Sequence, residues 1–188
     1  MSRDDLQKTA QQLLTNLGIK KGSAVLDFGC GNGSYSIATA YLVNKQGLVV
    51  AVDESEETIE KLEQKTKEKR FENITTYNQL SAIPPSLHAT FNVILAFDVL
   101  HYLEENKRNE VYGEFHRLLS SDGLLVIHPK HTKDNHPMWH FSTVTISDLK
   151  HEIETVGFQF LQQKTVSLLH DNHLEQGPIL ILKKRTGT

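Results

Sequence analysis

Apolar runs of strand length alternate with amphipathic segments through most of this 188-residue chain. In the amphipathic segments the apolar residues recur at helical spacing, as Leu6, Ala10, Leu13 and Leu17 do near the N-terminus. Alternating strands and helices favour a parallel sheet that is joined by right-handed crossovers and covered by helices on both faces. We expect strands at residues 23–28, 47–53, 73–78, 91–100, 124–128, 158–169 and 178–184, and helices at 6–17, 36–43, from 56 onward, 111–119 and 146–157. Ser55 can cap the helix that begins at 56, and "SSDG" should break the chain after the helix that ends at 119.

The last two expected strands follow one another with only a polar loop between them. The final strand should therefore run antiparallel to the others, because a parallel connection needs a crossover. We predict an α/β three-layer sandwich, a Rossmann-like and mostly parallel sheet of about seven strands with the last one antiparallel. The length favours a single domain over residues 1–188. The helix within residues 1–22 is a candidate cover for a ligand site.

Composition excludes several classes of partner and compartment. The net charge of −3 gives no basic field for nucleic acid or anionic lipid, so we expect neither nucleic acid nor a membrane as a partner. Cys30 is the single cysteine, which rules out an intramolecular disulfide. We find no signal-peptide pattern and no segment of membrane-spanning length, and a cytoplasmic location is expected.

A glycine-rich turn, "VLDFGCGNGSY", follows the first expected strand. Its glycines permit positive φ and a close approach of a ligand to the main chain. Asp53 ends the second expected strand, where a carboxylate can accept hydrogen bonds from the two hydroxyls of a ribose. The spacing is G-x-G-x-G, whereas dinucleotide sites use G-x-G-x-x-G. Asp27 adds a negative charge beside the turn and favours a cationic ligand over a pyrophosphate.

Four motifs in order, "VLDFGCGNG", "VVAVDES", "FNVILAFDVLHYL" and "LLSSDGLLVIHPK", resemble those of class I S-adenosylmethionine-dependent methyltransferases. The chain is most similar to the small-molecule type found in ubiquinone biosynthesis, and the resemblance covers roughly residues 6–130. It implies S-adenosyl-L-methionine as cofactor and methyl transfer to a small-molecule acceptor. The identity of that acceptor, the attacked atom and the oligomeric state stay open.

The resemblance also implies a set of donor-binding residues. Gln79 stands where the family usually has an acid that accepts from the adenine amino group, so it can accept that bond only as a neutral amide. Cys30 is expected to be structural filler within the turn rather than a nucleophile. The implied positions are Asp27, Gly29, Cys30, Gly31 and Gly33 at the turn, Asp53 and Glu54 after the second strand, Gln79 and Leu80 after the third, and Phe97 and Asp98 at the end of the fourth.

Ten histidines are the candidates for acid–base chemistry, because imidazole titrates nearest to neutral pH. His101 follows the fourth expected strand, and His131 lies in "HPKHTKDNHPMWH" after the fifth. We predict that these two line the acceptor pocket and that one serves as a general base; polar loop composition is the alternative. Convergence of imidazoles on a metal is a further alternative, but their spacings match no zinc signature, and no metal is expected. An apolar wall for the acceptor could be formed by Trp139, Met138, Phe141 and Tyr102, or these residues could pack in the core.

Two other functions stay open at this stage. One is a non-catalytic protein of the same fold that binds S-adenosylmethionine, which the departure at Gln79 would suit. The other is a nicotinamide-dependent oxidoreductase. Binding of the demethylated donor without binding of NAD would exclude the oxidoreductase.

Overall fold

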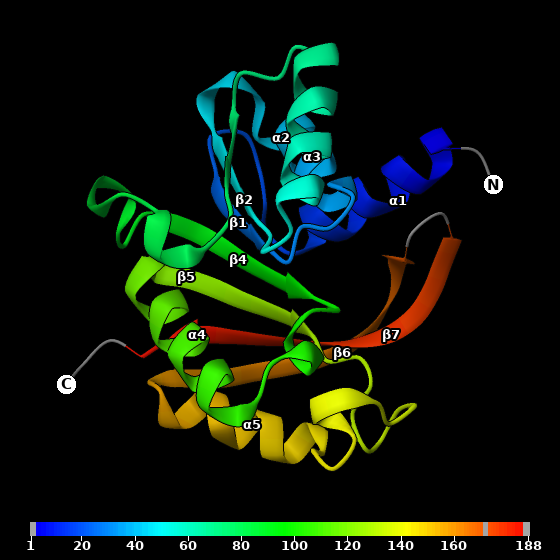
Figure 1. The fold of residues 1–188 in the computed structure, drawn as a ribbon, viewed down its shortest axis with the longest axis vertical. Helices are drawn as coiled ribbons and strands as arrows, with labels where there is room; N and C mark the ends of the chain where they lie inside the picture. Colours follow the sequence, from blue (N-terminus) through cyan, green and yellow to red (C-terminus); the bar gives the residue numbers. More distant parts are fainter. Residues whose placement is uncertain (1–2, 171–172, 186–188) are drawn as a thin grey trace. The chain divides into compact units, whose positions relative to one another are not determined.

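The structure of the chain is a computed structural model, and it describes residues 3–170 and 173–185. Seven strands form one mixed sheet in the order β3-β2-β1-β4-β5-β7-β6 (Figure 1). The predicted α/β, Rossmann-like class is therefore confirmed. The chain forms two compact units, residues 3–83 with 166–170 and 173–177, and residues 84–165 with 178–185. The organisation as one domain stays a prediction, and each unit is described by itself.

The strands and helices have the following bounds. The strands are β1 (Ala24–Phe28), β2 (Leu48–Val52), β3 (Ile74–Tyr77), β4 (Phe91–Phe97), β5 (Leu119–His128), β6 (Phe158–His170) and β7 (His173–Lys184). The α-helices are α1 (Arg3–Asn16), α2 (Ser34–Val43), α3 (Glu56–Glu68), α4 (Glu105–Leu118) and α5 (Ile146–Thr155). Short 3₁₀ turns include η2 (Leu80–Ala82), η4 (Leu100–Tyr102) and η5 (Trp139–Phe141).

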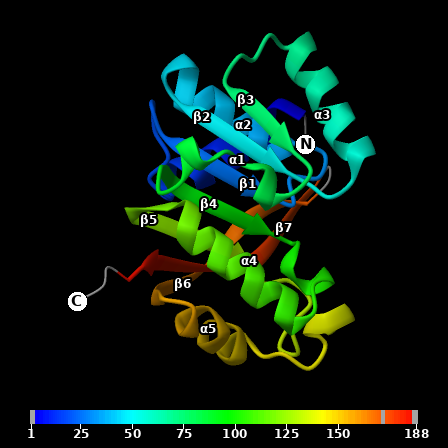
Figure 2. The same ribbon diagram turned by 60° about the vertical axis from the view of Figure 1, so that its left-hand side comes forward.

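The first unit contains three parallel strands. β1 pairs with β2 from Ala24↔Leu48 onward, and β2 pairs with β3. The central positions of β1 and β2 are fully buried, which is what near-continuous apolar runs predict for a sheet covered by helices. α2 packs against β1 and β2, and α3 packs against β3 (Figure 2).

Local sequence signals explain where the helices of this unit begin and what they bury. The Ser55 side chain accepts a hydrogen bond from Thr58 N and caps α3, as predicted. Ile37 of α2 and Leu62 of α3 pack with Cys30 in one buried apolar cluster. The turn after β1 is therefore anchored on its inner side by two helices.

The second unit combines parallel and antiparallel pairing. β4 and β5 are parallel, and β5 pairs with the antiparallel β7 through Leu124↔Lys183 and the following positions. The antiparallel last strand predicted from the missing helix is therefore confirmed. The Thr145 side chain and Asp148 form a capping box at the start of α5.

Several boundaries differ from the sequence-based expectation. β4 ends earlier, at Phe97, and α4 begins earlier, at Glu105. Two further differences lie where polar segments continue a strand. "SSDG" was expected to break the chain between helix and strand, but β5 already starts at Leu119 and includes this segment. β6 and β7 also extend into the expected polar loop, to His170 and from His173, and residues 171–172 lie outside the described part. In both places polar residues continue a strand, because exposed strand positions tolerate polar side chains and the ladder is formed by the backbone.

Candidate functional site

The turn after β1 has a backbone that only glycine adopts readily at three positions. Gly29, Gly31 and Gly33 have φ values of 71°, 50° and 79°, all in the left-handed region. The N–H groups of Gly29 and Cys30 donate to the carbonyl of Val52 at 2.8 and 3.0 Å. The turn is thereby fixed to the end of β2.

Gly33 and Gly31 differ in the space that surrounds them. A Cβ on Gly33 would lie 2.4 Å from Leu62 Cδ1, so any side chain there would displace the buried Leu62 side chain of α3. A Cβ on Gly31 would meet no atom within 4 Å among the described residues. A side chain at Gly31 would thus project into open space beside the turn, where a ligand has room to lie against the main chain.

Asp53 connects the end of β2 to the turn. Its Oδ2 accepts a hydrogen bond from Gly31 N at 2.9 Å, and its Oδ1 accepts one from Ser55 N at 3.1 Å. Each carboxylate oxygen can accept more than one hydrogen bond, so acceptor capacity remains for hydroxyl donors of a ligand. The predicted ribose acid and the predicted glycine turn are therefore in direct contact.

Asp27 is an acid buried beside this turn. Only 4% of its surface is exposed, and Ser36 Oγ donates to its Oδ2 at 2.5 Å. Burial raises the pKa of Asp27 to about 6, against the lowering effect of the Ser36 hydrogen bond and with a further increase from the charge of Asp53. The carboxylate is mostly ionised at neutral pH, and a cationic ligand nearby would stabilise that charge.

The remaining predicted residues of the first unit differ in exposure. The Cys30 side chain is buried in the apolar cluster, and burial raises the pKa of its thiol, which argues against a nucleophilic role. Glu54 and Gln79 are exposed, whereas Leu80 is buried at the start of η2. These residues follow the ends of β2 and β3, where the prediction placed them.

In the second unit the chain turns sharply after β4. Phe97 is buried at the end of the strand, and Asp98 has a left-handed φ of 54°. Asp98 Oδ1 lies 3.6 Å from His101 Nδ1 and 4.0 Å from His131 Nε2. Asp98 Oδ2 lies 3.4 Å from Lys130 Nζ. The two histidines predicted to be catalytic are thus brought together around one carboxylate.

His101 is buried without conventional polar contacts. It is 1% exposed, and neither ring nitrogen has a hydrogen-bond partner among the described residues. Burial, followed by the charges of His131, Lys130 and His128, lowers the pKa of His101 to about 3. The ring is therefore neutral across the physiological range and offers a lone pair rather than a positive charge.

Aromatic rings surround the histidines. Trp139 stacks on His101 at a centroid distance of 4.9 Å, and it meets the edge of His131, also at 4.9 Å. Tyr102 lies 5.0 Å from Trp139. Trp139 is 49% exposed and Tyr102 is 55% exposed, so these two rings form an accessible apolar surface rather than core. Met138, also predicted for the wall, is exposed, whereas Phe141 is fully buried and belongs to the core.

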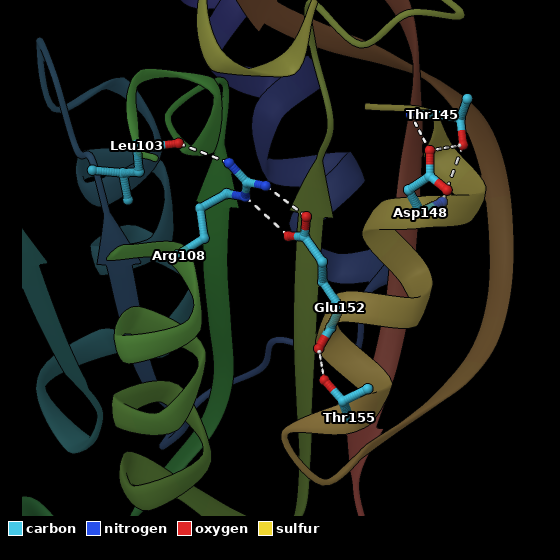
Figure 3. Close-up of polar contacts among 6 residues, drawn as sticks. All are labelled: Leu103, Arg108, Thr145, Asp148, Glu152 and Thr155. Atoms are coloured by element: carbon cyan, nitrogen blue, oxygen red, sulfur yellow. Dashed lines mark hydrogen bonds and ion pairs between the residues drawn. The ribbon is translucent and has the colours of Figure 1, made fainter. Parts of the chain in front are cut away.

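The sequence did not lead us to predict a buried ion pair between Arg108 of α4 and Glu152 of α5. Arg108 of α4 is 2% exposed and donates two hydrogen bonds to Glu152 of α5, at 2.9 and 2.5 Å, and a third to Leu103 O at 2.8 Å (Figure 3). Its guanidinium also lies over the ring of Phe141, 5.0 Å from the centroid. The signal was available, because Arg108 continues the apolar face of α4 that Val111 belongs to.

Comparisons with known proteins identify the family. Residues 19–173 match the family model described as "Methyltransferase domain". A "SAM dependent methyltransferase" from Aquifex aeolicus has the same fold, with a TM-score of 0.76 and 18% identity over 96% of this chain and 93% of that one. A magnesium protoporphyrin IX methyltransferase from Synechocystis, solved with bound S-adenosylmethionine, has a TM-score of 0.69 and 21% identity over 95% and 79% of the two chains.

A curated relative is similar over a shorter segment. It is a "Probable cobalt-precorrin-6B C(15)-methyltransferase (decarboxylating)" of Saccharolobus solfataricus, 39% identical over 59 residues, which are 31% of this chain and 28% of the relative. This chain thus matches less than a third of that relative's length. The family match covers most of the chain, and the chain belongs to the methyltransferase domain family. It is a class I enzyme that uses S-adenosylmethionine as its methyl donor.

The residues of the first unit fit this donor. The open space at Gly31 leaves the main chain accessible, and the buried carboxylate of Asp27 suits a ligand with a sulfonium and an ammonium. The family also decides between a methyl donor and a nicotinamide, in favour of the donor. Among the described helices, none combines the length and the apolar character needed to cross a bilayer.

Proposed function

We propose that this methyltransferase transfers a methyl group to a small-molecule acceptor, with the donor held at the Gly29–Gly33 turn. The observation that carries the donor site is the direct contact between this turn and Asp53, next to the buried Asp27. The turn gives a bare main chain, Asp53 gives acceptors for ribose hydroxyls, and Asp27 gives a negative charge for the cationic end of the donor.

The other donor contacts are proposed from the family pattern. Glu54 and Gln79 are exposed at the ends of β2 and β3, as residues beside a ribose and an adenine should be. Leu80 would supply an apolar contact to the base. Phe97 and Asp98 end β4, and ligands of open α/β sheets bind outside the carboxyl ends of the strands.

The acceptor side is proposed to lie at His101, His131 and the exposed rings of Trp139 and Tyr102. Half-exposed aromatic rings next to buried polar groups are typical of pockets for small organic ligands. The chain's net charge of −3 gives no general attraction to nucleic acid. The structurally similar magnesium protoporphyrin IX methyltransferase acts, by its name, on a small molecule.

Methyl transfer from a sulfonium requires the protein mainly to position the donor and the acceptor. The bound donor supplies a methyl group on a sulfonium; the acceptor atom forms the new bond to carbon as the bond to sulfur breaks, and the sulfur becomes neutral. Collinear placement and exclusion of water can supply several kcal/mol of the barrier. His101 and His131 are proposed to act on the acceptor, and a neutral His101 contributes a lone pair in that role.

Two experiments test this function in sequence. Calorimetry with S-adenosylhomocysteine should show one saturable site per chain, and NAD should show none. The chain is then incubated with donor carrying a labelled methyl group and a fractionated metabolite extract. We expect label in a low-molecular-mass fraction. Label only in protein or nucleic acid would contradict the small-molecule acceptor, and donor binding without any transfer would favour a non-catalytic binding protein.

A further inference from the structure

We propose that Asp98, His101 and His131 form a binding site for a divalent transition-metal ion in the second unit. One carboxylate oxygen and one nitrogen from each ring lie within 4.8 Å of one another. Two ligands on a tetrahedral zinc ion, with bonds of about 2.1 Å, lie about 3.4 Å apart. The contacts of Asp98 Oδ1, 3.6 Å to His101 Nδ1 and 4.0 Å to His131 Nε2, are close to that separation. Side-chain rotations that bring the two imidazoles closer together would complete the site.

The hydrogen bond made by His131 aims a lone pair at the carboxylate. Its Nδ1 lies 3.2 Å from the carbonyl oxygen of His136, so this nitrogen carries the proton and donates. Nε2 then presents its lone pair toward Asp98 Oδ1, which is itself an acceptor. Two acceptors that face each other repel unless a proton or a cation lies between them. A carbonyl that fixes the tautomer is also what orients metal-binding histidines in proteins.

The ring of His101 is buried and supplies a second nitrogen lone pair. It is 1% exposed, and both ring nitrogens lack a hydrogen-bond partner within the described part of the chain. A buried polar group without a hydrogen-bond partner destabilises the folded state. A metal ion bound at Nδ1 would relieve this cost.

The shell around the three residues resembles that of a metal site. Trp139 and Phe141 contact the His101 ring, with centroids at 4.9 and 6.4 Å, and they limit the access of water. Two imidazoles and one carboxylate suit zinc, ferrous iron or manganese better than magnesium or calcium, which prefer sets of oxygen ligands. Three protein ligands leave at least one coordination position for a water or another molecule.

Lys130 places a positive charge next to the proposed metal site. Its Nζ lies 3.4 Å from Asp98 Oδ2, on the carboxylate oxygen that does not face the imidazoles. A divalent ion next to this ammonium would be repelled. Removal of the Lys130 charge should tighten binding of the metal alone.

The test measures binding of cobalt(II) and zinc(II) to the full chain after removal of any affinity tag and treatment with chelator. Cobalt(II) reports its coordination through visible absorption, and zinc(II) is measured by competition. We expect one ion per chain. Asp98→Asn and His131→Asn should each weaken binding at least about tenfold, whereas Lys130→Met should strengthen it about tenfold. His151→Asn, at an exposed histidine of α5, is the matched control and should leave binding unchanged.

Circular dichroism checks the fold of each variant. His131→Asn is preferred over a change at the buried His101, and Lys130→Met gives a gain of affinity that misfolding does not produce. No saturable cobalt binding, or equal binding by the wild type and the Asp98 and His131 variants, would overturn the site. The titration contains no donor and no acceptor, so such a failure leaves the proposed methyl transfer unaffected.

Discussion

The glycine turn of the first unit (Gly29–Gly33) and the histidine cluster of the second (Asp98, His101 and His131) differ in how their polar groups are arranged before a ligand binds. At the turn, both carboxylates already accept hydrogen bonds, Asp53 from Gly31 and Ser55 and Asp27 from Ser36. In the cluster, His101 is fully enclosed although neither of its ring nitrogens has a hydrogen-bond partner among the described residues. The carboxylates of the turn form hydrogen bonds before a ligand binds. The ring nitrogens of His101 have no such partner among the described residues until a ligand or a metal ion binds.

This contrast follows from what each region has to recognise. A methyl donor that is shared by a whole family can be bound by a fixed backbone geometry. Such a preformed site reorganises little when the donor binds. An acceptor differs from enzyme to enzyme, and its site consists of side chains on irregular segments such as η4 and η5. The predictions below test whether the two regions are as independent as this comparison implies, from the largest expected effect to the smallest.

The strongest test disrupts the support of the cluster. Arg108→Ala removes one partner of a buried ion pair and leaves Glu152 uncompensated, so we expect a loss of about 3–5 kcal/mol in the free energy of unfolding. Lys107→Ala, in the same helix but with an exposed pair to Glu110, should cost no more than about 0.5 kcal/mol. Chemical denaturation measures both. Equal effects of the two variants would mean that the Arg108 pair does not hold this unit together.

The two glycines of the turn should separate stability from binding. Gly33→Ala places a Cβ against Leu62 at a positive φ, and should lower the free energy of unfolding by about 2–4 kcal/mol. In Gly31→Ala the added methyl group has no atom of the described residues within 4 Å. The variant should cost about 1–2 kcal/mol from its φ alone, yet its methyl group points where the donor is proposed to lie. Denaturation and calorimetry together should therefore show the greater loss of donor affinity per kcal/mol of stability in Gly31→Ala. The reverse order would place the donor elsewhere.

Asp53→Ala should weaken donor binding by about 1–3 kcal/mol, since it removes charge-assisted hydrogen bonds to the ribose and the anchor of Gly31. Asp53→Asn keeps an acceptor oxygen and should fall between the wild type and the alanine variant. Calorimetry with S-adenosylhomocysteine provides both values. Unchanged affinity in Asp53→Ala would show that the ribose assignment is wrong.

The smallest expected effect concerns the ionisation of Asp27, which should lower the stability of the fold but favour donor binding. The pKa of Asp27 rises from 3.8 to about 6 on folding, so this residue lowers stability progressively as the pH increases from about 4 to about 6, and the cost is constant above that range. Asp27→Asn removes the ionisation and should raise the free energy of unfolding by about 1–2 kcal/mol at pH 8 but not at pH 4.

Donor binding should respond to Asp27 in the other direction. The wild type should bind S-adenosylmethionine less tightly below pH 6, as the carboxyl is protonated, and Asp27→Asn should bind weakly at every pH. Thermal denaturation and calorimetry across pH 4–8 check both parts. An Asp27→Asn variant that is less stable than the wild type at pH 8 would show that the carboxylate is not strained by burial.

The sequence predicted most of the framework because its signals are local. Leu6 and Leu13 are buried on α1 as their spacing indicates, Ser55 caps α3, and the missing last crossover predicts an antiparallel β7. The glycine turn and Asp53 were also readable, since glycine spacing and an acid at a strand end depend on backbone conformation and strand order.

The cluster was only partly predictable. His101 and His131 were selected for their place in the chain, but their approach to one carboxylate depends on left-handed backbone at Asp98 and His131. Asp and His are enriched in that conformation, but most of them do not adopt it, so the residue types alone do not predict it. The Arg108–Glu152 pair is another tertiary match between helices. Such contacts depend on how separate elements pack, and periodicity within one element does not specify that.

The central claim is that donor and acceptor functions reside in separate sets of residues, and one series of titrations tests it most directly. S-adenosylhomocysteine is titrated into the wild type, Asp53→Ala and His131→Asn, each confirmed to be folded. The account predicts a loss of at least about fivefold in affinity for Asp53→Ala and a change of less than about twofold for His131→Asn, although methyl transfer falls in both. Equal loss of donor affinity in the two variants would contradict it.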